Sequence, residues 1–451
     1  MGRKYVPAWV WAVLVGIHLL ALSWALSRGG WAFPDSGRYL QAAENLRLYG
    51  ELYARAWPSS APDGQAVQEF TIRPPAYPLA VLILGGNTNI WRVLLVQNLL
   101  SLLNIGLVLS WWARRVQPKT STWGVVVIGL LSFPAQFIYA NAGMSEILLQ
   151  TAVVAIVGAS LLFIREQKKQ YFAGIAIALV LALLLKPVFY PLTIILAGVS
   201  LVLAWWRKRM VWGVLGMIPL VVVGLYMEWN WQRTKYFHFS SIAEINLLHY
   251  NAAGVVRQID GRAAEEKWIN NVLRAADAEP NFAARQQFIQ ERAGAVLWAH
   301  PVVYARQHMQ GMVAMFLDPG RFDISQFLGL NTPDGGALHE QTRAGGLLRA
   351  IGRLPLGLLG ILGAVLLANV VRLVLAGRGF WQLRKSGPML RYGRWVAGGL
   401  LFYVALLTGP LGASRFLVPV WPLLLGLALE GLQSGTPIVA SSRDAKDAGS
   451  A

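Results

Sequence analysis

The sequence has no cysteine and few charged residues for its length. Without cysteine the chain can form neither a disulfide nor a thiolate metal site. Only 14% of its 451 residues are charged, whereas a soluble protein carries about a quarter. The six histidines show no metal-ligand spacing, and no glycine-rich loop of the nucleotide-binding type is present. These absences argue against a soluble enzyme and against a nucleotide-linked substrate.

Apolar residues make up most of the chain instead. They account for 55% of the sequence, and several runs reach the ~20 apolar residues that a helix needs to cross a bilayer. The sequence therefore predicts an all-α polytopic membrane protein, with about ten transmembrane helices in a lipid bilayer. The expected spans cover residues 6–26, 90–113, 123–139, 145–164, 171–185, 189–206, 211–229, 354–375, 395–408 and 416–432.

The net charge of +18 has a topological explanation. Basic residues gather directly after apolar runs, as at Arg114–Arg115 and Arg207–Arg209. Such clusters mark the cytoplasmic ends of membrane spans, so no nucleic-acid partner is expected. An even number of crossings places both termini in the cytoplasm, with the protein in the plasma or inner membrane. The first apolar run, residues 5–27, is longer than the core of a cleavable signal and is expected to remain as an anchor.

Changes in polarity divide the chain into regions. We expect an N-terminal transmembrane module over residues 1–230, with a first external loop at 28–89. A larger external helical region at 231–350, which faces the periplasm or the exterior, precedes the C-terminal transmembrane helices at 351–433. The small and polar residues of 434–451 predict a disordered cytoplasmic tail.

The first external loop contains the most distinctive local patterns. Pro34–Asp35–Ser36 is typical of a helix start, where the Asp side chain can accept from the first backbone amides. The residues that follow predict an amphipathic helix that ends at Gly50 and lies along the membrane surface. Arg73–Pro74–Pro75 cannot lie inside a helix, so it is expected to begin a short apolar piece at residues 76–84.

Five short motifs follow one another in a recognisable order. They are PDSGRYL at 34–40, RPPAYP at 73–78, MSE at 144–146, KP at 186–187 and SRFLVPVWP at 414–422. This order resembles the C-type glycosyltransferases, and more narrowly the bacterial relatives of the protein O-mannosyltransferases and of the lipid A aminoarabinose transferase. The stretches 230–251 and 299–306 are also similar to these bacterial members.

The resemblance implies a reaction and part of its site. It implies that a sugar passes from a polyprenyl-phosphate carrier to a glycan, lipid or protein acceptor on the external face, with inversion and without a covalent enzyme intermediate. The family's acidic residue maps onto Asp35, its basic-Pro-Pro element onto Arg73–Pro74–Pro75, and the basic residue of its last motif onto Arg415. Ser36 stands where many relatives have a second acid, and Arg73 where many have lysine. The motifs identify no cofactor, and they do not decide whether a divalent cation is required.

Four residues are the candidates for chemistry and donor binding. The carboxylate of Asp35 could take the proton of the attacking hydroxyl, or it could simply cap a helix. Arg73, Lys186 and Arg415 lie at predicted external membrane boundaries, where positive charge would balance a departing phosphate. The alternative for these three is that each basic side chain extends to the lipid headgroups. Lys186 also precedes a proline and could serve only as a helix break.

Five further residues are candidates for binding the sugar or the acceptor: Tyr39, Glu44, Glu69, Glu146 and His249. Tyr39 lies one helical turn from Asp35, but it could equally pack on the membrane surface. Glu146 begins a span, where the helix dipole favours an acid without any further role. The acids of the first loop, Asp63 among them, could serve as a second acid or be solvated charges. No set of residues is assigned to a metal.

Three other functions remain open on the sequence. A flippase or transporter for a lipid-linked glycan would need charged or broken helices at the membrane midplane, whereas the expected spans contain few acids. A glycan polymerase or ligase would use a diphosphate-linked carrier. A non-enzymatic membrane anchor for a partner complex would not need the ordered motifs.

Overall fold

The structure is helical throughout the residues that it describes. It is a computed structural model that describes residues 4–57, 64–330 and 356–433, and no strand occurs among them. Eight of its spans are long and apolar enough to cross a membrane. They are α1 (Ala8–Arg28), α5 (Ile90–Val116), α8 (Glu146–Glu166), η2 and α10 (Pro187–Phe189, Tyr190–Arg207), α11 (Met210–Thr234), α20 and η4 (Leu356–Gln382, Leu383–Lys385), α21 and η5 (Pro388–Thr408, Gly409–Leu411), and α22, η6 and α23 (Ser414–Leu417, Val418–Val420, Trp421–Gly431). The prediction of an all-α polytopic membrane protein is confirmed.

Two of the predicted spans differ from simple membrane helices. The third forms α6 (Thr122–Leu131) and α7 (Pro134–Ala140), which are bent by 59° to one another. Proline has no backbone N–H and disfavours a helical residue before it, so the helix breaks at Pro134. The fifth forms α9 (Lys169–Leu185), which has only 17 residues. The described residues thus contain eight spans, or up to nine if the bent pair crosses as one, and the predicted count of ten is not established.

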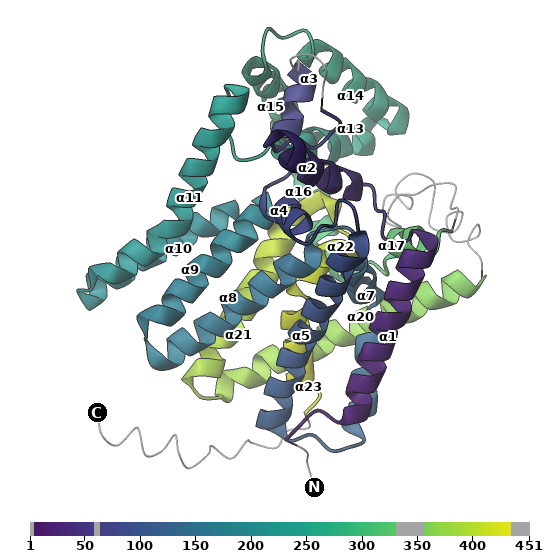
Figure 1. The fold of residues 1–451 in the computed structure, drawn as a ribbon, viewed down its shortest axis with the longest axis vertical. Helices are drawn as coiled ribbons and strands as arrows, with labels where there is room; N and C mark the ends of the chain where they lie inside the picture. Colours follow the sequence, from purple (N-terminus) through teal and green to yellow (C-terminus); the bar gives the residue numbers. More distant parts are fainter. Residues whose placement is uncertain (1–3, 58–63, 331–355, 434–451) are drawn as a thin grey trace.

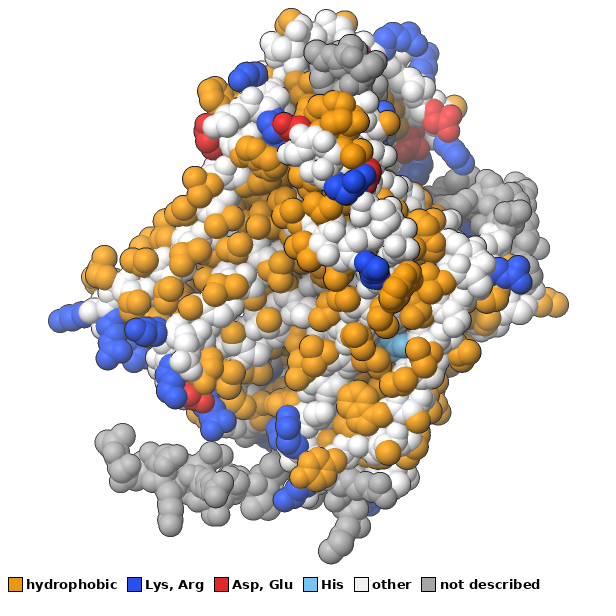
Figure 2. All heavy atoms as spheres, in the orientation of Figure 1, with side chains coloured by type: hydrophobic (Ala, Val, Ile, Leu, Met, Phe, Trp, Pro, Cys, Tyr) orange, Lys and Arg blue, Asp and Glu red, His pale blue; other side chains and the backbone are white. Residues whose placement is uncertain are grey.

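The long helices form a bundle with a lipid-facing surface. Figure 1 shows the start of α1 and the end of α23 at the same end of the bundle. Apolar side chains cover the face formed by α8 to α11 (Figure 2), and Trp205, Trp206 and Met210 are more than three-quarters exposed. So many exposed apolar residues are stable against lipid and not against water. The protein is therefore a multi-pass membrane protein.

The other end of the bundle carries a group of shorter helices that we call the cap (Figure 1). It consists of α2 (Ser36–Tyr49), α3 (Gly64–Val67), η1 (Gln68–Phe70), α4 (Ala76–Ile83), α12 (Ile242–Asn246), the π-helix η3 (Leu247–Ala252), α13 (Ala253–Asp260), α14 (Arg262–Ala276) and α15 (Phe282–Ala299). From the cap, α16 (Pro301–Leu317) and α17 (Arg321–Leu328) lead back to the bundle. The cap thus joins the two regions that the sequence predicts to be external. The predicted tail at 434–451 and the stretch 331–350 lie outside the described residues.

The first helix of the cap follows the predicted pattern. α2 ends at Gly50, which has a φ of 71° that favours glycine. Its buried face packs on α4 and includes Asn45, whose Nδ2 donates to the carbonyls of Tyr53 and Arg55 at 2.7 Å each. This contact ties the end of α2 to the loop that follows it. One face of α2 therefore serves contacts within the protein, and its expected position along the membrane surface stays a prediction.

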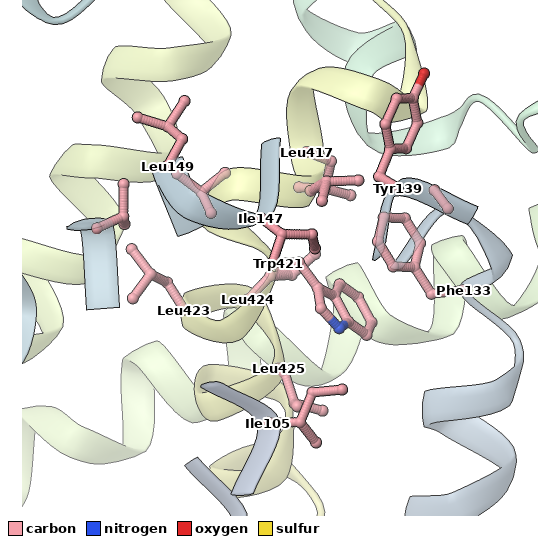
Figure 3. Packing of buried hydrophobic residues seen from close by; sticks show 14 of the residues in the cluster. Ile105, Phe133, Tyr139, Ile147, Leu149, Leu417, Trp421, Leu423, Leu424 and Leu425 are labelled. Carbon is pink, nitrogen blue, oxygen red and sulfur yellow. The ribbon is translucent and has the colours of Figure 1, made fainter. Parts of the chain in front are cut away.

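The core of the bundle surrounds the last helix. Trp421 and Leu424 of α23 pack against Ile105 of α5, Ile147 of α8 and Phe133 before α7 (Figure 3). The rings of Phe133 and Trp421 are stacked with 4.2 Å between their centroids. In lipid such close packing, and not exclusion of water, holds helices together. The central position of α23 fixes the segment before it, which enters the functional site.

A network of buried amide side chains joins α5, α7 and α8. Gln136 and Gln150 exchange hydrogen bonds at 2.8 and 3.0 Å, and Asn98 donates to Asn141 at 2.8 Å. Gln97 donates to the carbonyl of Ala142 at 2.8 Å, in the turn between α7 and α8. Polar groups inside a membrane bundle need such partners. The network holds this turn, and therefore the start of α8, in one position.

Candidate functional site

A cavity of about 600 Å³ lies between the cap and the membrane helices. Seven of the nine residues proposed from the sequence line it: Asp35, Tyr39, Arg73, Glu146, Lys186, His249 and Arg415. They come from segments far apart in the chain: the two ends of the first loop, the starts of α8 and η2, the π-helix η3 and α22. The fold therefore brings most of the candidates to one place.

Arg415 stands at the centre of a cluster of charged side chains in this cavity. Its Nη2 donates to Asp35 Oδ2 at 2.9 Å, and its Nε donates to Glu146 Oε1 at 2.7 Å. Arg73 Nη2 donates to Asp35 Oδ1 at 2.5 Å, and Lys186 Nζ donates to Glu146 Oε1 at 2.9 Å. Three cations therefore share two carboxylates, and the cluster keeps a formal charge of +1.

Asp35 occupies the N-cap position of α2 but does not cap it. Its side chain accepts no hydrogen bond from the first amides of the helix, and both of its oxygens face guanidinium groups. The plain helix cap considered for this residue is therefore wrong. The helix start places the carboxylate at the edge of the cavity, where it is about one-quarter exposed.

Arg73 is held on two sides. Its guanidinium carbon lies 4.9 Å from the ring centroid of Tyr39. That ring packs nearly perpendicular to the ring of Tyr77, with 4.8 Å between the two centroids. Pro74 and Pro75 follow it and directly precede α4, as expected. Arg73 is only 7% exposed, so its side chain points into the protein and does not extend to lipid headgroups.

The charges around Asp35 control its protonation. Burial by itself would raise the pKa of this carboxyl, but Arg415 and Arg73, with Lys186 farther away, lower it below the ordinary value. A carboxylate paired in this way is a weak base. It becomes a stronger one only when another anion draws the guanidinium groups away.

The segment that presents Arg415 is held by two acids, the half-buried Asp318 and the buried Asp323. Asp318 Oδ2 accepts from the backbone amide of Ser414 at 2.9 Å, and Asp323 Oδ2 accepts from the Ser414 hydroxyl at 2.5 Å. The other oxygen of Asp323 accepts from Tyr139 at 2.7 Å. Burial and the nearby Asp318 raise the pKa of Asp323 to about 6. Neither acid was a candidate on the sequence, since their partner lies in a distant motif.

Glu44 and Glu69 are not among the residues that line the cavity. Glu44 is partly exposed on α2 and pairs with Arg47 and Asn87. Glu69 is buried and pairs with Arg38 at 3.3 Å and with Arg55 at 3.1 Å. Asp63 lies outside the described residues.

His249 lines the cavity from η3. Burial lowers its pKa, which favours the neutral imidazole. Among the described residues, no group of three or more His, Cys, Asp or Glu side chains is arranged to hold a metal ion.

The cap also contributes polar residues that the sequence analysis did not select. Glu244 of α12 and Arg285 and Gln286 of α15 line the same cavity. Glu244 falls within the stretch 230–251, where it is the only acid. An isolated acid in such a stretch was the signal that could have indicated it.

Comparisons with known proteins give two similar solved structures. No family model and no curated protein matches the sequence. The crystal structure of ArnT from Cupriavidus metallidurans bound to undecaprenyl phosphate has a TM-score of 0.38 and 17% identity, over 94% of this chain and 77% of that chain. The apo structure of the same protein has a TM-score of 0.36 and 16% identity, over 90% of this chain and 78% of that one. Similarity at this level says nothing by itself about a reaction.

Proposed function

We propose that this protein is an inverting glycosyltransferase that moves a sugar from a polyprenyl-phosphate carrier to an acceptor hydroxyl. The observation that carries this proposal is the charged cluster at the cavity, with Arg73, Lys186 and Arg415 around Asp35 and Glu146. It lies where the cap meets the membrane helices, so a lipid-borne phosphate and a water-borne acceptor can meet there. The order of the sequence motifs supports the same reaction.

The donor phosphate would bind by exchange with the carboxylates. Guanidinium groups form strong two-point hydrogen bonds with phosphate oxygens, so the phosphate competes with Asp35 for Arg73 and Arg415. The same cations stabilise the negative charge that develops as the phosphate leaves. Binding of the donor thus supplies the leaving group and at the same time restores the basicity of Asp35.

The chemical step is a single displacement. The acceptor oxygen forms a bond with the anomeric carbon while the bond from that carbon to the phosphate oxygen breaks. The proton of the acceptor hydroxyl passes to Asp35, and the polyprenyl phosphate leaves with the electron pair of the broken bond. Because the acceptor attacks from the side opposite to the phosphate, the configuration inverts and no covalent enzyme intermediate is formed.

The remaining lining of the cavity suits a lipid substrate. It includes the apolar side chains of Leu149, Leu185, Val404, Leu407 and Phe416. These residues belong to α8, α9, α21 and α22, which are parts of the bundle. They would contact the isoprenoid chain next to the phosphate.

The same proposal assigns a topology. The cap, with the regions 28–89 and 231–350, would face the periplasm or the exterior, and both termini would be cytoplasmic. The regions 1–230 and 351–433 would supply the membrane helices. Accessibility of single introduced cysteines to a membrane-impermeant reagent tests this, since the natural chain has no cysteine.

The donor class is tested by native mass spectrometry of gently extracted full-length protein. We expect a bound polyprenyl monophosphate sugar in the wild type. The affinity for added undecaprenyl phosphate should fall tenfold or more in Arg73→Ala, Lys186→Ala and Arg415→Ala, because each substitution removes a charged partner of the phosphate. Arg47→Ala, at an exposed pair on α2, should bind as the wild type. A diphosphate-linked oligosaccharide in the site would contradict the proposal and favour a polymerase, a ligase or a flippase.

A further inference from the structure

The cavity is lined by further polar residues that take no part in the charged cluster. Glu244 and Gln286 line it from α12 and α15. Glu244 is 5% exposed and Gln286 is 1% exposed. Within the described part of the chain, Glu244 Oε2 and Gln286 Nε2 are buried and have no hydrogen-bond partner.

A third residue, Gln290 of α15, holds the carboxyl of Glu244. Gln290 Nε2 donates to Glu244 Oε1 at 2.9 Å, and the same nitrogen lies 2.9 Å from the hydroxyl of Tyr236. Gln286 lies four residues before Gln290 on α15, and residues at this spacing share a helix face. Gln290 therefore orients the carboxyl of Glu244 toward the face that also carries Gln286.

The two unpartnered atoms have complementary chemistry. A buried donor or acceptor without a partner is costly in a folded protein, and here an amide donor and a carboxyl oxygen belong to two residues that line the same cavity. A hydroxyl group can accept from the first and donate to the second. The nearby cation Arg285 is paired with Asp277 at 2.9 Å, and a carboxyl disfavours a phosphate. The part of the cavity that Glu244 and Gln286 line therefore suits an uncharged ligand with several hydroxyl groups.

We propose that Glu244 and Gln286 form a binding subsite for the hydroxyl groups of a carbohydrate. The inference rests on the proposed function, since it places the phosphate at the charged cluster and a sugar at Glu244 and Gln286, which line the same cavity. The hydroxyl groups belong either to the donor sugar or to a glycan acceptor. The two sources are distinguished by the experiment.

The test compares binding of undecaprenyl phosphate with binding of undecaprenyl phosphate that carries glucose, mannose, galactose or arabinose. Full-length wild type, Gln286→Leu and Glu244→Ala are measured in lipid nanodiscs. The quantity of interest is the ratio of the affinity for the lipid with its preferred sugar to the affinity for the bare lipid. If the subsite binds the donor sugar, this ratio falls about tenfold in each variant, which is the effect of one lost hydrogen bond. Binding of the bare lipid stays unchanged, which also shows that the variants are folded.

Gln287→Leu is the matched control, because Gln287 is the next residue on α15 and is exposed. It should leave both affinities unchanged. For an acceptor subsite, the donor affinities of Gln286→Leu stay unchanged, while the KM for a cell-envelope glycan fraction rises about tenfold. If neither the sugar gain nor this KM changes, the subsite is overturned although the proposed function stands. If the wild type does not bind the bare lipid, both the subsite and the proposed function are contradicted.

Discussion

Arg415 Nη2 donates a hydrogen bond of 2.9 Å to Asp35 Oδ2, across 380 residues of the chain. The same guanidinium donates through Nε to Glu146 at 2.7 Å. Because a guanidinium is planar and rigid, these two bonds fix the two carboxylates relative to each other. The last motif of the sequence, the first loop and the start of α8 therefore form one site.

Arg415→Lys should lower transfer activity at least about tenfold, although it keeps the charge. An ammonium group is a single point of charge and cannot hold both carboxylates in the geometry of the guanidinium. The rate of sugar transfer in membranes or nanodiscs measures this. Arg47→Lys, at the partly exposed pair with Glu44, is the control and should be as active as the wild type. Equal activity of Arg415→Lys and wild type would show that charge alone is sufficient.

Asp35→Asn should separate catalysis from binding. We expect transfer to fall by about 10²–10⁴-fold, because the amide cannot take the proton of the acceptor. Binding of bare undecaprenyl phosphate should become tighter, because the amide no longer competes with phosphate for Arg73 and Arg415. Parallel measurements of turnover and lipid affinity test both expectations. Loss of lipid binding together with activity would mean that Asp35 only supports the structure of the site.

Asp323→Asn should change how thermal stability depends on pH. The folded pKa of about 6 lies above the ordinary aspartate value of 3.8, so the folded protein binds more protons than the unfolded chain. Ionisation of Asp323 therefore lowers the free energy of unfolding as the pH rises from about 4 to about 6, by on the order of 3 kcal/mol in total. The groups that face it are Asp318, Ser414, Tyr139 and Arg415.

The measurement for this prediction is the difference in Tm between Asp323→Asn and wild type. The Tm of the variant minus the Tm of the wild type should be larger at pH 7 than at pH 4.5, because asparagine does not titrate. Burial lowers the pKa values of His238 and His249, which has the opposite effect on stability in an overlapping range and cancels in the difference. A constant difference in Tm would contradict the prediction.

The contact between α20 and α23 should tolerate no added methyl group at Gly379. A Cβ there would overlap the carbonyl oxygen of Leu427, so Gly379→Ala must separate the helices at a cost of about 1–3 kcal/mol. Gly377, two residues earlier on α20, has open space around its Cα. Gly377→Ala should therefore leave the Tm unchanged or raise it slightly. Equal Tm values for the two variants would show that the helices can move apart without cost.

The sequence by itself determined the kind of protein and most of its helices. Within the residues that the structure describes, the apolar runs predicted from the sequence are helical apart from the break before Pro134, because length and hydrophobicity decide whether a segment is stable across lipid. Local backbone rules also explain the end of α2 at Gly50 and the start of α4 after Pro74 and Pro75. The break at Pro134 follows from the same rules, although the apolar pattern around it predicted one continuous span.

Only the tertiary structure decided which charges meet. Glu69 and Asp35 are both acids of the first loop, yet Glu69 pairs with Arg38 and Arg55 while Asp35 faces the cavity. Glu146 could be read as an ordinary first-turn acid until Arg415 and Lys186 were found against it. Such pairs depend on the approach of separate segments, which for Arg415 lie 269 and 380 residues from their partners, and local patterns do not encode this approach. The same is true of Glu244 and Gln286, which line one cavity only because α12 packs against α15.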